Sequence, residues 1–144
     1  MSAKAIETTV QKFHQWLESV RGNLGLRTTP DGAYSALRAV LHALRDRLSV
    51  ESAAHLAAQL PMLVRGLFFE GWDPTDKPLK IRTRDDFLDL VESRLDTKEW
   101  LAAEDAVVAV FRALEQHVDP GEMAKLEKQL PDEVRQLLHV GSRH

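Results

Sequence analysis

The chain has 144 residues, a length typical of one domain, and 44% of them are hydrophobic, which is enough for a real core. It contains no cysteine, which excludes a disulfide scaffold, a thiolate metal site and a cysteine nucleophile. The net charge is −3, and the first 72 residues carry eight Lys and Arg against six Asp and Glu, so we expect no nucleic-acid-binding face.

No apolar run approaches the roughly 20 residues that a membrane-spanning helix needs. The N-terminal stretch also lacks the apolar segment of a secretory signal peptide. We therefore expect a cytoplasmic protein that does not enter a membrane.

The first helix is predicted over residues 4–21, with Gly22 as its stop. Its apolar positions recur every three or four residues and form one stripe, which we expect to face the core: Ile6, Val10, Phe13, Leu17 and Val20.

The next helix is predicted to begin at Pro30, with Thr29 as its N-cap, and to end near Arg47. A wide apolar stripe runs along it: Ala33, Ala36, Leu37, Val40, Leu41, Leu44 and Leu48. Ala39 and Ala43 add a strip of small side chains, which lets neighbouring helices approach closely. We expect this helix to pack on more than one side.

Two short helices should follow, because Ser49 can cap one over 50–60 and Pro61 then ends it and opens another over 62–70. Residues 73–82 contain two prolines and are predicted to be a linker. Thr83 is the expected cap of a further helix, and a second central helix is predicted over 98–117. Asp119 should cap the last pair of short helices, which Pro131 divides.

The stretch 33–72 returns seventy residues later, without a gap, as 103–138. The second central helix repeats the apolar stripe of the first, position for position: Ala103, Ala106, Val107, Val110, Phe111, Leu114 and Val118. The predicted fold is an all-α helical bundle of two tandem, sequence-related repeats, 1–72 and 83–140, followed by a tail, 141–144. Each repeat has a long helix pair and two short helices around a Leu-Pro break, and the two pack as one compact domain.

Several runs carry a family resemblance: Arg38-Ala39-Val40-Leu41, Ala57-Ala58-Gln59-Leu60-Pro61, Arg65-Gly66-Leu67-Phe68-Phe69-Glu70-Gly71-Trp72 and Gln129-Leu130-Pro131. With them, nearly the whole chain resembles an uncharacterised bacterial family, the domain of unknown function twenty-two sixty-seven. The resemblance implies a small all-helical protein built from a duplicated unit. It implies no activity, so it supplies no catalytic residue.

The residues themselves point to no catalytic, cofactor or metal site. The six histidines are scattered, and neither Glu-x-x-His nor His-Glu-x-x-His occurs. There is no P-loop, no Gly-x-Ser-x-Gly and no dinucleotide fingerprint. We therefore expect a protein that is not an enzyme and has no cofactor.

The two repeats differ in polarity at four matched positions. Ala57, Ala58, Met62 and Leu63 are apolar, whereas their counterparts are Glu127, Lys128, Asp132 and Glu133. These positions can therefore face water, and something should cover them in the first repeat. One interpretation is a core edge beneath a loop or the linker. The other is an interaction patch for a second copy or another protein, extended by Phe69 and Trp72. Trp72 itself is either a plug that holds the linker or a binding hot spot.

Four cationic side chains of the first repeat form a second candidate site, an anion face: Arg38, His42, Arg45 and Arg65. The first three lie at helical spacing and could bind a phosphate, or they could form an ordinary solvated face. Arg65 and Gln59 recur as Arg135 and Gln129, so they could instead bond the carbonyls left free at each proline break. The leading hypothesis is an interaction module, a homodimer or an adaptor. The alternative is a small-ligand or anion-binding protein.

Overall fold

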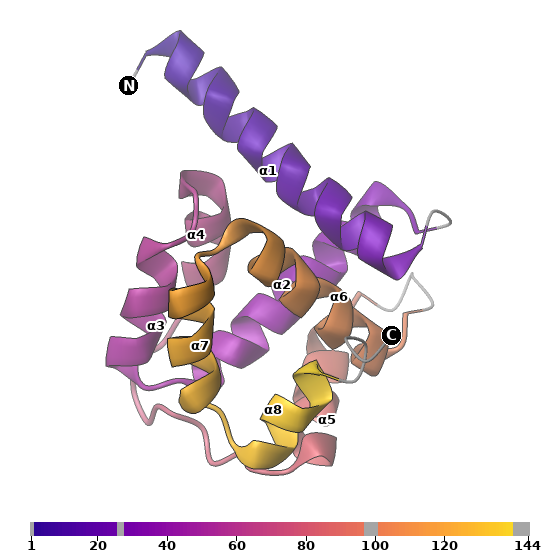
Figure 1. The fold of residues 1–144 in the computed structure, drawn as a ribbon, viewed down its shortest axis with the longest axis vertical. Helices are drawn as coiled ribbons and strands as arrows, with labels where there is room; N and C mark the ends of the chain where they lie inside the picture. Colours follow the sequence, from indigo (N-terminus) through magenta and orange to yellow (C-terminus); the bar gives the residue numbers. More distant parts are fainter. Residues whose placement is uncertain (1, 26–27, 97–100, 140–144) are drawn as a thin grey trace.

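The computed structural model describes residues 2–25, 28–96 and 101–139. Within these ranges the chain forms eight α-helices and no strand, as predicted (Figure 1). Their bounds, in chain order, are α1 (Ala3–Leu24), α2 (Pro30–Arg47), α3 (Val50–Ala58), α4 (Met62–Phe69), α5 (Arg84–Arg94), α6 (Ala103–His117), α7 (Pro120–Lys128) and α8 (Asp132–Leu138).

The helix starts follow the local sequence signals. Each predicted N-cap accepts a hydrogen bond from a backbone N–H of the first turn: Thr29, Ser49, Thr83 and Asp119. These bonds satisfy donors that a helix start otherwise leaves without a partner. Capping therefore explains why four of the helix starts could be predicted to the residue.

Two predicted boundaries differ from the structure by three residues or more. Gly22 does not end α1, which continues to Leu24 and stops at Gly25, where φ is 114°. Only the second glycine adopts a backbone conformation that other residues avoid, so it is the one that ends the helix. The second central helix begins at Ala103, because Ala102 is extended, with φ −70° and ψ 134°. The rest of its predicted start, 97–100, lies outside the described residues.

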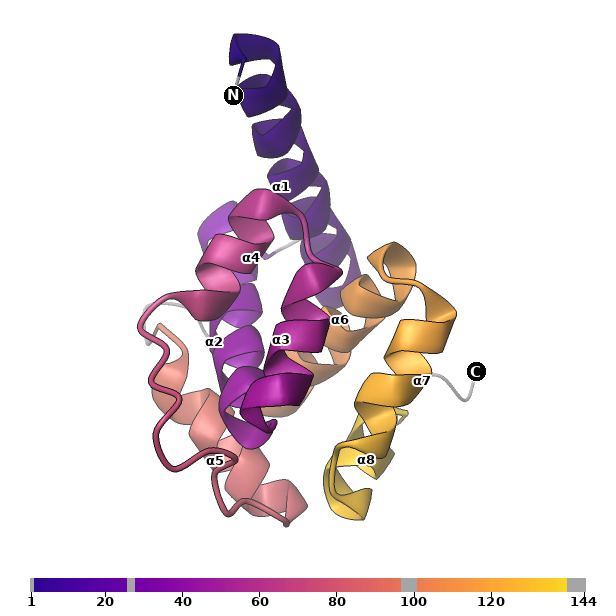
Figure 2. The ribbon, with the colours of Figure 1, turned by 90° about the vertical axis from the view of Figure 1, so that its left-hand side faces the viewer.

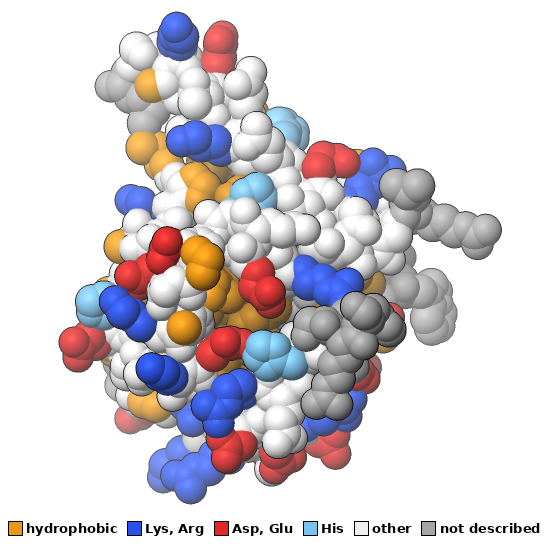
Figure 3. All heavy atoms as spheres, viewed as in Figure 1, with side chains coloured by type: hydrophobic (Ala, Val, Ile, Leu, Met, Phe, Trp, Pro, Cys, Tyr) orange, Lys and Arg blue, Asp and Glu red, His pale blue; other side chains and the backbone are white. Residues whose placement is uncertain are grey.

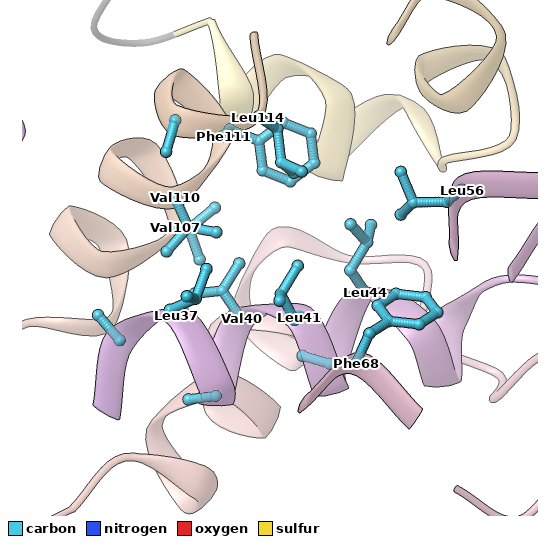
Figure 4. Close-up of a cluster of buried hydrophobic side chains, with 14 of the residues drawn as sticks. Leu37, Val40, Leu41, Leu44, Leu56, Phe68, Val107, Val110, Phe111 and Leu114 are labelled. Atoms are coloured by element: carbon cyan, nitrogen blue, oxygen red, sulfur yellow. The ribbon is translucent and has the colours of Figure 1, made fainter. Parts of the chain in front are cut away.

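The core forms around α2, and 13 of the 18 residues of this helix are buried. Its apolar stripe faces that of α6, and Figure 4 shows four side chains from each helix pointing toward one another: Leu37, Val40, Leu41, Leu44, Val107, Val110, Phe111 and Leu114. Ala39 and Ala43 are also fully buried. The prediction that α2 packs on more than one side is confirmed, because α1, α4, α5 and α6 all contact it.

The two halves of the chain interlock. The first helix, α1, packs on α6 as well as on α2, and α5 packs on α2 as well as on α6. The first long helix of each half therefore contacts the central helix of the other half. One cluster of buried apolar side chains includes residues from all eight helices, so the halves share a core.

The two Leu-Pro breaks have nearly the same backbone geometry. Gln59 has φ −88° and ψ −7°, and Gln129 has φ −87° and ψ −5°. The next residue but one is Pro61 or Pro131, which is extended and stands at the N-cap of the following helix. The predicted division of each short-helix pair by proline is confirmed.

The burial of the core predicts that truncating two leucines lowers the free energy of unfolding by very different amounts. Leu41 is fully buried, so Leu41→Ala should lower the free energy of unfolding by about 2–5 kcal/mol. Leu63 is 40% exposed, and Leu63→Ala should cost less than about 1 kcal/mol. Urea denaturation of the two variants measures this difference. Equal losses would contradict the assignment of Leu41 to the core and Leu63 to the surface.

Candidate interaction surface

The N-terminal part of α1 projects beyond the other helices (Figures 1 and 2). The apolar stripe of α1 continues along this projecting part, but the side chains of the stripe become exposed there. Val20 is fully buried and Trp16 is 2% exposed, whereas Val10 is 40% and Ile6 is 51% exposed. The outer part of the stripe is therefore apolar but uncovered.

A second pair of exposed apolar residues lies on the neighbouring helix. Met62 and Leu63 at the start of α4 are 50% and 40% exposed, and α4 contacts α1. Figure 3 shows apolar side chains gathered along the side of projecting α1 that faces the body. We call Ile6, Val10, Met62 and Leu63 the arm surface.

The structure divides the six residues of the predicted patch. Ala58 is exposed beside Met62 and Leu63, so neither a loop nor the linker covers these three. Ala57 is 3% exposed and belongs to the core, a correction to the prediction. It faces inward because it lies four residues after buried Ala53, on the same side of α3.

Phe69 and Trp72 are half-buried and pack on each other. Their ring centroids lie 5.2 Å apart, and the backbone N–H of Trp72 donates to the carbonyl of Phe69 at 3.0 Å. Phe69 also makes an edge contact with Phe68, which is fully buried. This aromatic group therefore lies at the opposite end of α4 from the arm surface.

The sequence analysis missed Ile6 and Val10 because it assigned the whole stripe of α1 to the core. A length comparison could have found them. At about 1.5 Å per residue, the 22 residues of α1 span about 33 Å, whereas the 15 residues of α6 span about 22 Å. This difference in length indicates that α6 cannot cover the whole stripe, and α2 and α4, which also contact α1, leave its outer part exposed.

His42 and Arg45, from the predicted anion face, are each only 4% exposed. The Nε2 of His42 lies 2.7 Å from the carbonyl oxygen of Leu67. Arg45 donates to the carbonyls of Phe68 and Glu70 at 3.0 and 2.7 Å. Both the anion-site and the solvated-face interpretations are therefore wrong for these two residues. The reason is that the last carbonyls of α4, which lack helical partners, lie against α2 and need donors.

Arg38 and Arg65 have other roles. Arg65 donates to the carbonyls of Ala57 and Leu60 at 3.0 and 2.9 Å, which confirms its predicted bonds to free carbonyls at the proline break. Arg38 pairs with the carboxylate of Glu70 at 2.8 Å near the surface. The structure therefore does not bring the four cations together in one open anion site.

A buried ion cluster ties α2 to α5. Asp46, only 4% exposed, accepts from Arg45 at 2.9 Å and lies 2.7 Å from Nη1 of Arg94. Burial alone would raise the pKa of the Asp46 carboxyl, but the hydrogen bonds from the two arginines hold it below its ordinary value. The backbone carbonyl of Asp46 accepts from Leu79 in the linker at 2.8 Å. The end of α2 thus holds α4, α5 and the linker.

The sequence of residues 13–137 matches the family model described as "Uncharacterized conserved protein (DUF2267)". The chain belongs to the DUF2267 family. No curated protein matches it. Across the described part of this DUF2267 protein, no helix has the length and apolar character to cross a membrane. The same residues include no group of three or more His, Asp or Glu side chains placed to hold a metal ion.

The buried ion cluster predicts that replacing two charged residues of the DUF2267 chain lowers the free energy of unfolding by very different amounts. Asp46→Ala leaves Arg45 buried without its carboxylate, and it should lower the free energy of unfolding by about 3–5 kcal/mol. Arg38→Ala removes an exposed pair and should cost at most about 1 kcal/mol. Chemical denaturation of both variants tests the contrast, and a small loss in the Asp46 variant would contradict a buried cluster.

The lowered pKa of His42 predicts how the free energy of unfolding of this DUF2267 protein depends on pH. Burial lowers the pKa of His42 below 6.5, and the Leu67 carbonyl only partly opposes this effect. The unfolded chain therefore takes up this proton at a higher pH than the folded chain. The free energy of unfolding should be highest above about pH 6.5 and should fall as the pH drops toward the lowered pKa of His42.

His117, which stacks on Trp16, acts with the same sign because burial also lowers its pKa. The measurement is a series of urea denaturation curves between about pH 7.5 and pH 5, spanning the ordinary histidine pKa. The double variant His42→Gln/His117→Gln should lose most of the slope. An unchanged slope would show that other groups cause it.

Proposed function

We propose that this protein is a non-enzymatic protein-interaction module, and that it associates through the arm surface with a second copy of itself. The observation that carries the proposal is the continuous stripe of α1. The stripe keeps its apolar character at Val10 and Ile6, where the body no longer covers it. A helix of a monomer normally carries polar residues on a solvent-facing side, so these positions favour a covered state.

The total exposed surface of the chain also supports association with a partner. A compact protein of 16.3 kDa exposes about 7,500 Å², whereas this chain exposes 8359 Å². The surplus of roughly 900 Å² is close to the ~800 Å² that each partner buries in a standard interface. The projecting part of α1 is one source of this surplus.

The shape of the arm surface also suits a two-fold dimer. A two-fold axis requires that the same patch on both copies be complementary to itself. Here a projecting apolar helix stands beside an exposed apolar helix start, so α1 of each copy could lie on α4 of the other. An adaptor that binds a different protein is the second form of this proposal. It has the same apolar residues and the same surface area in its favour, but it does not make use of the self-complementary shape.

The alternative of an anion-binding protein has less support. His42, Arg45 and Arg65 all contact backbone carbonyls, and Arg38 pairs with Glu70. An anion would have to displace these bonds, and the buried carbonyls would then lose their donors.

The test compares three variants by light scattering over a concentration series. The wild type should approach twice 16.3 kDa. Val10→Glu and Leu63→Glu should remain monomeric, because a charge on the arm surface would be desolvated in the dimer. Gln15→Glu, an exposed change on the opposite side of α1, is the matched control and should dimerise like the wild type.

Circular dichroism should give the same helicity for all four proteins, because each altered side chain is exposed in the monomer. Unfolding of Leu63→Glu would place that residue in the core. A wild type that stays monomeric at every concentration would contradict self-association, and a dimer that both arm variants retain would place the interface elsewhere.

A further inference from the structure

A cleft of about 370 Å³ lies between α3 and α7, and none of its lining residues belongs to the arm surface. The two helices lie side by side and run in opposite directions (Figures 1 and 2). The cleft volume is within the range of small-molecule sites, roughly 300–1,000 Å³.

The lining of this cleft is matched between the two halves of the chain. Four pairs of lining residues are each separated by seventy positions, and three of them are chemically similar: Leu56 and Leu126, Gln59 and Gln129, and His55 and Lys125. The fourth pair, Ser52 and Glu122, differs in charge. Each wall therefore presents a leucine, a carboxamide and a base. Because the helices are antiparallel, the two carboxamides stand toward opposite ends of the cleft.

The two leucines form an apolar floor, since they are 5% and 6% exposed beneath the polar lining. The carboxamides have no structural task within the described residues, where neither side chain makes a hydrogen bond. The prediction that Gln59 and Gln129 bond the carbonyls at the proline breaks is therefore wrong. Arg65 binds those carbonyls at the first break, and at the second break Arg135 donates to the carboxylate of Asp132. A carboxamide offers a carbonyl acceptor and N–H donors, which can pair with the N–H and the C=O of a peptide unit.

The rim of the cleft carries one acid and one base on each wall. Glu51 and His55 lie 4.0 Å apart, and Glu122 and Lys125 lie 3.4 Å apart. Both pairs are exposed on at least one side and contribute little to stability, so a ligand can exchange with them at small cost. With acids on both walls, the cleft suits a ligand that carries both charges better than a simple anion.

We propose that this cleft binds a short peptide in an extended conformation. One apolar side chain rests on the Leu56–Leu126 floor, and the flanking peptide units pair with the carboxamides of Gln59 and Gln129. The terminal ammonium and carboxylate of the peptide lie toward the acids and bases of the rim. At about 3.3 Å per residue, a tripeptide is about 10 Å long, which suits a cleft of this volume.

The probe is the tripeptide Ala-Leu-Ala, added to ¹⁵N-labelled full-length protein and followed by NMR. We expect a Kd on the order of 1 mM for so few contacts, so the titration runs to about 10 mM. The side-chain amide signals of Gln59 and Gln129 should shift together with backbone signals of α3 and α7. The tripeptide Ala-Glu-Ala, which lacks the apolar side chain, should bind at least about tenfold more weakly, since the floor is apolar.

The double variant Gln59→Ala/Gln129→Ala should also weaken binding about tenfold or more, while Gln116→Ala, another exposed glutamine, should leave it unchanged. Leu63→Glu, which alters only the arm surface, should bind the peptide like the wild type, so failure of one proposal does not imply failure of the other. No shift in α3 and α7 at the highest concentration would overturn the peptide site. Shifts that persist equally in the double glutamine variant would overturn it as well.

Discussion

At the end of α2 three ionisable side chains lie inside the core, two of them bonded to the end of α4 and one paired with a side chain of α5. His42 contacts a carbonyl of α4, Arg45 donates to two more, and Asp46 pairs with Arg94 of α5. A buried polar group without such partners would cost more than an isolated hydrogen bond contributes. The rest of the structure depends on this constraint, because it fixes where α4, α5 and the linker must lie.

Because the end of α4 is fixed on α2, the position of the start of α4 is fixed as well. The C-terminal carbonyls of this helix are held against α2, so Met62 and Leu63 remain at the opposite end, beside the projecting part of α1. The part of the arm surface that belongs to α4 is therefore held in place by the buried contacts between α4 and α2. The description of the DUF2267 family names no activity, so the argument for association comes from the exposure, surface area and shape of this chain.

Local signals made much of the fold predictable. Thr29 and Pro30 mark the start of α2, and Pro61 and Pro131 divide the short-helix pairs, because capping and proline act within one turn. The burial of His42 and Arg45 could not be predicted, since it depends on carbonyls 23–25 residues away in the chain. Similarly, the stripe of α1 predicted which side of the helix is apolar. It did not predict that the other helices cover this side at Trp16 and Val20 but leave it exposed at Val10 and Ile6.

Hydrogen exchange measured at several protein concentrations tests the central claim most directly, because it locates the surface that association covers. The proposal predicts that backbone amides in the first three turns of α1, and those at the start of α4, exchange more slowly as the concentration rises. Amides of α5 should exchange at the same rate throughout. Exchange in α1 that does not depend on concentration, in a protein that nevertheless dimerises, would contradict the assignment of the arm surface as the interface.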